Sequence, residues 1–179
     1  RFQSDVERSG TGSLLLWPAD VRRLVHSWQR RGGIGTLTEI MNDDVASRVD
    51  EVNAERRRRA TLAPEVSVRA AEDLSIVSML TREHRCFGSR STDNERETGF
   101  LVRDALPGLP PAQAKEVIES SLFVDDGEGS RRLHHRTAQE FLAARGVMRL
   151  MGTQPGGFDL VSLFVRPSPA GLVIPASLR

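Results

Sequence analysis

A glycine-rich turn between two short apolar runs most constrains what this chain can fold into. Residues 122–135 read "LFVDDGEGSRRLHH", with Gly127 and Gly129 inside the turn. Glycine supplies the positive-φ positions that a tight hairpin needs, and aspartate favours the turn. The pattern predicts a β-hairpin in which Asp125 and Asp126 lie in a solvent-exposed turn rather than in a Mg²⁺ site.

Segments with helical periodicity lie on both sides of this hairpin. Pro111 suits the first turn of a short helix over "PPAQAKEVIESS", and Pro64 suits the start of a longer one that Gly88 would end. A third helix is predicted from Thr137 to Met151. The apolar residues expected to be buried are Val66, Ala70, Leu74, Val77, Met79 and Leu80 in the long helix, and Ala138, Phe141, Leu142, Val147, Met148 and Met151 in the last.

The first sixty residues are predicted to be helical as well. "LLLWPADVRRLVHSWQRRGG" places Pro18 in a first helical turn and ends in two glycines. Thr36 and Glu39 have the spacing of a capping box before the next helix. The run Arg56–Arg59 is interpreted as a solvated helix end in preference to a polyanion contact. Residues 1–13 have weak periodicity, and residues 89–98 are predicted to be a loop.

The order helix, helix, hairpin, helix is that of a winged-helix unit. We therefore expect a mainly α fold, a helical domain followed by a winged-helix domain with a small β-hairpin wing. The expected domains are residues 1–60, residues 61–151 and, in 152–179, the start of a following helical or repeat region. Because the chain begins with Arg1 and ends without a clear cap, we expect it to be a piece of a longer protein.

Composition excludes several classes of function. The 179 residues carry a formal net charge of +1, which gives no bulk attraction to nucleic acid or membrane. Cys86 is the only cysteine, so an internal disulfide and a cysteine-built zinc site are excluded, and a reducing cytoplasm is expected. No apolar run reaches the length of a membrane span.

Sequence motifs for catalysis are equally scarce. Lys115 is the only lysine and follows no Gly-x-x-x-x-Gly loop, so a nucleoside-triphosphate P-loop is absent. There is no His-Glu-x-x-His motif, and Cys86 lies two positions after His84 on a predicted helix, which points them to different faces. The remaining candidates are His134 and His135. Each is either a hydrogen-bonded structural histidine or a donor to a phosphate oxygen.

The residues that include the two histidines carry a family resemblance. "LHHRTAQEFLAA" resembles the winged-helix signature of NACHT-type STAND signalling NTPases, the NLR-like class, which reads roughly aromatic-x-His-x-Ser/Thr-x-Gln-Glu-Phe/Tyr-Leu-Ala. His135 takes the histidine place, and Leu133 stands where the family has an aromatic residue. The segments "WPADVRRLVHSW", "LTEIMNDDV" and "NAERRRRATLAPE" precede it in the family's order, so the resemblance covers most of residues 14–151, without the P-loop core.

The resemblance implies a regulatory role. His135 would contact the β-phosphate of ADP and hold a closed state, and Pro18 would contact the adenine, with ADP or ATP shared with an upstream NTPase domain. This part of the chain would not be an enzyme, would hold no metal, and would serve bacterial defence or signal transduction in a cytoplasmic protein that forms homo-oligomers on activation. Membrane and nucleic-acid partners are not expected. The alternatives are a free-standing winged-helix DNA-binding regulator and a structural helical interaction module.

Overall fold

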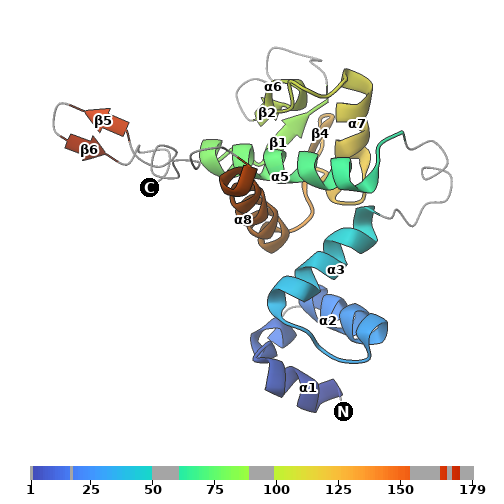
Figure 1. Cartoon of the computed structure of the whole chain (residues 1–179). Coiled ribbons are helices and arrows are strands. Elements are labelled where there is room, and N and C mark those ends of the chain that lie inside the picture. The colour runs from blue at the N-terminus through green and yellow to red at the C-terminus, as the bar shows by residue number, and fades with distance from the viewer. Residues whose placement is uncertain are drawn as a thin grey trace. The chain divides into compact units, whose positions relative to one another are not determined.

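A computed structural model gives the fold, and it divides the chain into two compact units, Arg1–Arg58 and Arg59–Arg179, each described by itself (Figure 1). The described residues are 2–16, 18–49, 61–88, 99–153, 166–168 and 171–173. The predicted loop at 89–98, the basic run Arg56–Arg59, and Trp17 lie outside them. Within this part of the chain, no helix is both long and apolar enough to cross a membrane.

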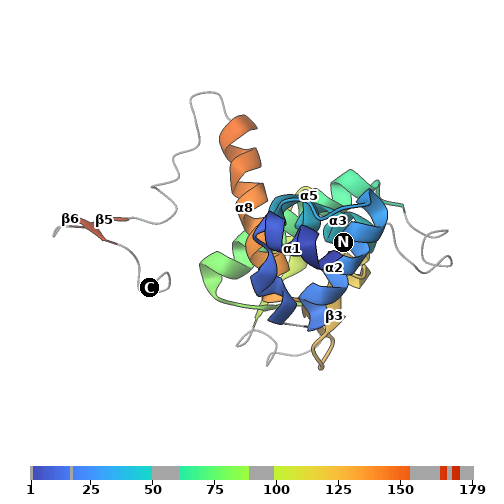
Figure 2. The ribbon, with the colours of Figure 1, turned by 90° about the horizontal axis from the view of Figure 1, so that it is seen from below.

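The first unit is helical, as predicted. It comprises α1 (Phe2–Ser9), the 3₁₀ helix η1 (Gly12–Leu16), α2 (Pro18–Arg31) and α3 (Leu37–Val49), and its three α-helices are labelled in Figures 1 and 2. Its core is formed by Val6, Leu24, Ile40, Met41 and Val45. Helix α1 was not expected from its weak periodicity. It is held by tertiary contacts, because the Trp28 Nε1–H donates to Asp5 at 3.1 Å and its ring meets Phe2 edge-on at 6.0 Å.

Ion pairs join α2 and α3. Arg23 is almost fully buried and donates to Asp44 of α3 at 3.1 Å, and Arg31 donates from Nε to Asp43 at 2.6 Å. That hydrogen bond from Arg31 keeps the pKa of the Asp43 carboxyl below its ordinary value despite partial burial. Asp44 also accepts from Arg48 at 3.2 Å, so the buried charges are shared in a network that helps to fix how the two helices meet.

The helix signals between α2 and α3 are confirmed. Gly32 has φ +71° and its N–H donates to Trp28 O, which ends α2. The Thr36 N–H donates to Glu39 Oε2 at 2.7 Å, and the Glu39 N–H donates back to Thr36 Oγ1 at 3.3 Å. This is the reciprocal capping box expected from the sequence.

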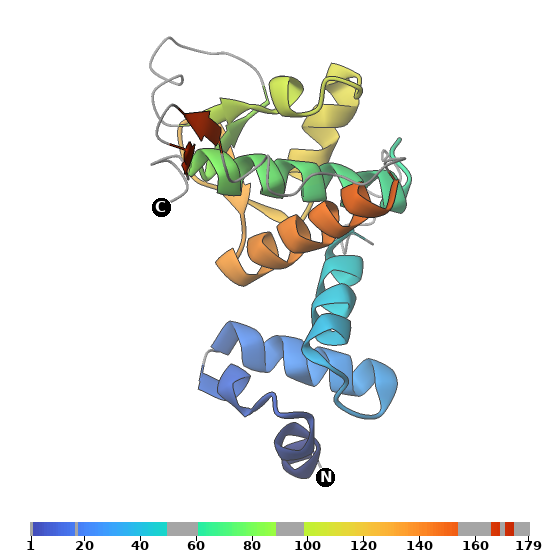
Figure 3. The ribbon, with the colours of Figure 1, turned by 60° about the vertical axis from the view of Figure 1, so that its left-hand side comes forward.

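The second unit has the predicted winged-helix architecture (Figure 3). Its sheet has the strand order β2-β1-β4-β3, and the hairpin of β3 and β4 forms the wing. Strand β1 pairs parallel to β2 and antiparallel to β4. The elements are α5 (Pro64–Thr81), β1 (Arg85–Phe87), β2 (Gly99–Leu101), α6 (Val102–Ala105), α7 (Pro111–Glu119), β3 (Phe123–Asp125), β4 (Ser130–Leu133) and α8 (Arg136–Thr153).

The expectation that the long helix continues to Gly88 is wrong. Helix α5 ends at Thr81, because Arg82 adopts a left-handed conformation with φ 62°. The Ser78 hydroxyl then donates to Glu83 O at 2.6 Å, which satisfies a carbonyl just past the helix end. The following residues enter the sheet, where Cys86 lies opposite Arg131. Pairing with a distant strand overrides the helical continuation, and no local signal announces it.

Three methionines predicted to be buried are exposed. Met79 is 44% exposed, Met148 67% and Met151 42%. The buried face of α5 instead carries Glu72, Ser75 and Ser78 beside its small apolar residues. Polar groups replace apolar ones there because each has a partner across the helix contact or in its own helix. Apolar periodicity predicts which face of a helix is buried from its apolar residues alone. It therefore did not predict a buried face that contains the carboxylate of Glu72.

Helices α5 and α8 form the largest helix contact of this unit and lie side by side in Figure 3. At their closest approach, a Cβ atom on Gly146 would lie 3.0 Å from Glu72 Cβ and 2.9 Å from Ile76 Cδ1. The Glu72 carboxylate, with its side chain 2% exposed, accepts from Arg145 at 2.8 Å and from Arg149 at 2.7 Å. Glycine at position 146 allows the backbones to approach closely enough for both ion pairs.

Charged groups hold the wing in place. Asp126 follows β3 and accepts from Arg132 of β4 at 2.7 Å and from Arg85 of β1 at 3.0 Å, so it joins three strands. Hydrogen bonds from Arg132 and then Arg85 hold the pKa of its carboxyl below its ordinary value. The turn itself has left-handed Gly127 and Gly129, as the sequence predicted. Further along the chain, β5 (Arg166–Ser168) and β6 (Gly171–Val173) pair as an antiparallel ribbon.

The close approach at Gly146 predicts a steric effect on stability. Gly146→Leu should lower the free energy of unfolding by about 1–3 kcal/mol, because the new side chain meets Glu72 and Ile76. Gly152→Leu in the same helix is the control, since a Cβ atom added to Gly152 would meet nothing within 4 Å, and it should change stability by less than about 0.5 kcal/mol. Equal effects in urea denaturation would contradict the packing.

The ion pairs of the wing predict a defined pH dependence. The folded pKa of Asp126 is depressed, so its contribution to stability is present above the unfolded value of about 3.9 and is lost as pH falls through the folded value. Asp126→Asn should therefore have a lower melting temperature than the parent at neutral pH, with the difference closing below about pH 4. The control is Asp104→Asn, which removes an exposed pair with the adjacent Arg103. A difference independent of pH would contradict the assignment.

Candidate functional site

The two candidate histidines join the wing to the last helix. His134 follows β4 directly, and His135 precedes the first residue of α8. Both side chains are half-buried, and their ring centroids are 6.4 Å apart with planes tilted by 48°. The two rings have different hydrogen-bond partners, and these partners indicate a different role for each histidine.

His134 is bound to the preceding strand region. Its backbone N–H donates to Leu122 O at 3.1 Å, and its ring Nδ1 lies 3.1 Å from the same oxygen. A carbonyl oxygen only accepts, so Nδ1 is the protonated ring nitrogen. Leu122 is fully buried, and the two bonds tie the end of the wing to the residue just before β3. His134 is therefore a hydrogen-bonded structural histidine.

His135 caps helix α8. Its carbonyl accepts from the Gln139 N–H, the first hydrogen bond of the helix, and its ring Nδ1 accepts from the Thr137 N–H at 3.2 Å. Because a backbone N–H only donates, Nδ1 carries no proton, and the neutral imidazole bears its proton on Nε2. The ring thus acts as an N-cap side chain with one nitrogen and has a donor at the other.

The residues after His135 in the motif mostly serve packing. Ala138 and Leu142 are buried, as predicted, and so is Ala143; the buried Gln139 donates to Ser78 Oγ of α5 at 2.9 Å. Ala144, in the same run, is exposed. The Gln139–Ser78 contact was missed from the sequence, because neither residue belongs to an apolar stripe. Leu133, in the place of the family's aromatic residue, is buried in β4 opposite Phe123.

Pro18 lies in the first unit. It is exposed and is the first residue of α2. Because the N–H group at this position has no partner within a helix, the missing N–H of proline costs no hydrogen bond. Pro18 and His135 belong to separate units, so the geometry of neither unit contains both residues.

Two other candidates are inert as sites. Cys86 lies on a buried strand instead of the predicted helix, and burial raises the pKa of its thiol to about 12, so it is not a nucleophile at neutral pH.

The glycine-rich loop at 32–35 borders a cavity of about 820 Å³ against α1. The Glu39 carboxylate already accepts the Thr36 N–H at the start of α3, so negative charge occupies the place where a phosphate would bind. Among the described residues, no cluster of three or more metal-binding side chains occurs.

Comparisons with known proteins add no assignment to this geometry. No protein-family model, curated protein or solved structure matches the chain.

The tautomers of the two histidines are directly testable. Long-range ¹H–¹⁵N correlation spectra of the chain with neutral imidazole rings should show His134 protonated on Nδ1 and His135 on Nε2. Exposed His26 on α2 provides an internal reference for an imidazole in water. The same tautomer at positions 134 and 135 would contradict the hydrogen bonds assigned to one of them.

Proposed function

We propose that this chain is the nucleotide-state-sensing, autoinhibitory part of a NACHT/STAND-type signalling NTPase, and that His135 is its sensor. The observation that carries the proposal is the hydrogen bond that the Thr137 N–H donates to Nδ1 of His135. Because Nδ1 accepts this hydrogen bond, the neutral ring carries its proton on Nε2, and the helix cap fixes the direction of this N–H group. A phosphate oxygen is an acceptor that such a donor suits.

The order of the elements supports this proposal. A helical unit is followed by a winged-helix unit, and the motif residues from His135 to Ala143 stand at the junction of wing and last helix. The nucleotide, ADP or ATP, would be held mainly by an upstream NTPase domain, with His135 donating to a phosphate oxygen and exposed Pro18 offering an apolar face to the base. The difference in charge between ADP and ATP would distinguish the two conformational states.

The role of His135 would be selective binding and not catalysis. A ligand shifts a conformational equilibrium only by its differential affinity for the two states. One hydrogen bond to a charged group contributes about 1.5–3 kcal/mol, which is enough to change a population ratio about ten- to a hundredfold. The proposal includes a cytoplasmic parent protein in bacterial defence or signal transduction that forms homo-oligomers when the ADP contact is lost.

The DNA-binding alternative has less support. In a winged helix the reading helix precedes the wing, which here is α7. Its basic side chains amount to Lys115, which is paired with Glu119 at 3.6 Å. Glu116 is committed to the backbone N–H groups of Thr61 and Leu62 at 3.0 and 3.1 Å. A helix with one lysine and two glutamates is poorly suited to phosphate contacts with DNA.

The test separates the donor from the helix cap, in the longer protein that carries the NTPase core. His135→Asp keeps an N-cap acceptor but loses the donor, whereas His135→Ala loses both. Both variants should retain at least about tenfold less ADP on purification, and basal oligomerisation should rise, whereas only His135→Ala should also lose about 0.5–2 kcal/mol of stability.

His26→Ala, which removes an exposed histidine of α2, is the matched control and should retain ADP. Parental ADP occupancy in His135→Asp would overturn the sensor role. A reading frame that begins near Arg1, with no Gly-x-x-x-x-Gly-Lys loop before it, would overturn the proposed family.

A further inference from the structure

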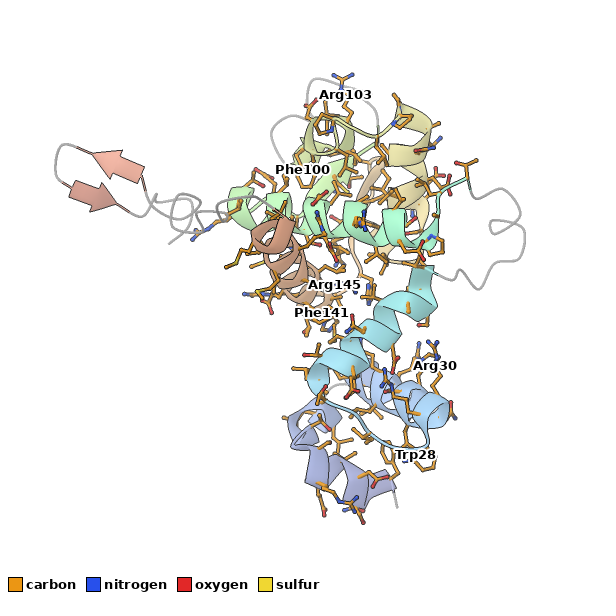
Figure 4. All side chains as sticks on the ribbon, in the orientation of Figure 1. Trp28, Arg30, Phe100, Arg103, Phe141 and Arg145 are labelled. Atoms are coloured by element: carbon orange, nitrogen blue, oxygen red, sulfur yellow. The ribbon has the colours of Figure 1, made fainter. Side chains whose placement is uncertain are left out.

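An apolar stripe follows the outer face of helix α8. Phe141, Ala144, Met148 and Met151 are spaced three, four and three residues apart, which places them in one line on the helix. Ala144 is exposed, Phe141 is half-buried, and Met148 is 67% exposed. Figure 4 labels Phe141 on this helix. The opposite face, with Leu142 and Gly146, is the one that packs against α5.

This spacing matches the a–d pattern of a coiled coil over two heptads. With Phe141 and Met148 at a positions and Ala144 and Met151 at d positions, Glu140 falls at g and Arg145 at the following e. In a parallel pair, a g side chain meets the e side chain five residues further along the partner helix. A second copy of α8 would therefore place Glu140 beside Arg145 of the partner subunit, and this pairing would occur twice by symmetry.

We infer that α8 is a self-association surface on which two copies of this chain pair in parallel through the stripe of Phe141, Ala144, Met148 and Met151. The charge pattern selects a second copy, because the same helix carries both signs at complementary positions. It also selects the parallel direction, since an antiparallel pair brings e against e, and thus Arg145 near its own copy. This inference does not depend on the nucleotide role of His135.

The existing ion pairs are compatible with this pairing. Arg145 donates to Glu72 from Nε and its side chain is 44% exposed, so its guanidinium can also approach the partner helix while Glu72 keeps both arginines. Glu140 is paired with Arg136, which is 87% exposed, and an exposed pair of this kind contributes little. Met148 and Met151 lie in the C-terminal half of α8 and are 67% and 42% exposed.

Sedimentation velocity across a concentration series tests the pairing. The chain should show a reversible monomer–dimer equilibrium, and Met148→Glu should weaken it at least about tenfold, because the new carboxylate would be buried in the seam. Met79→Glu is the matched control, since Met79 is an exposed methionine of α5, and it should leave the equilibrium unchanged. A chain that is monomeric at every concentration, or equal effects of the two variants, would overturn the inference.

A cysteine crosslink tests the direction. In a parallel pair, Ala144 faces the same residue of the other copy, so Ala144→Cys should form a disulfide-linked dimer on mild oxidation. Buried Cys86, with its raised pKa, should not compete. Ala112→Cys, on the exposed start of α7, is the control and should crosslink far less. Equal crosslinking of both variants would overturn the parallel pairing.

Thermal melting of Met148→Glu at a concentration where the parent is monomeric tests whether the stripe is exposed in the monomer. Because Met148 is exposed in the monomer, the melting temperature should match that of the parent. A drop at this dilution would show that the chain's own residues cover the stripe, which would overturn its assignment to a second copy.

Discussion

The carboxylate of Glu72 is the contact on which the winged-helix unit depends. It is buried between α5 and α8 and is neutralised by two arginines of α8, one turn apart. A buried charge is costly unless it is paired, so separating the two helices would take from this carboxylate both of the arginines that compensate it. Gly146 makes the contact possible, because any side chain there would push the backbones apart and separate the charges.

From this contact the geometry of the candidate site follows. With the middle of α8 fixed on Glu72, Gln139 reaches Ser78 at the other end of α5, and the start of α8 is placed against the end of the wing. His135 then caps the helix while His134 holds Leu122, and adjacent imidazoles are fixed as opposite tautomers. A donor positioned in this way loses little freedom when it binds an acceptor, which is the property required of a sensor. The outer face of α8 is left for the second copy that we infer.

The sequence was most informative where the signal is local. The wing turn, the capping box of Thr36 and Glu39, the proline-started helices and the glycine that ends α2 all follow from backbone conformations that few residues adopt, and all were predicted. The helix α1, the early end of α5 and the strand at Cys86 were not, because each depends on a partner far along the chain. At the site, the sequence selected His135, but it could not separate the roles of the two histidines.

The kind and order of most elements follow from the sequence alone, because periodicity, caps and turn residues act over a few positions. The sequence also restricts the chemistry, since its one lysine follows no Gly-x-x-x-x-Gly loop and its one cysteine cannot form an internal disulfide. Which faces are buried depends on how the helices and strands pack, and packing places Glu72 inside and Met148 outside. The same holds for the proton on each histidine ring, because its position depends on whether a carbonyl or an N–H group lies opposite the nitrogen, and distant contacts position those groups.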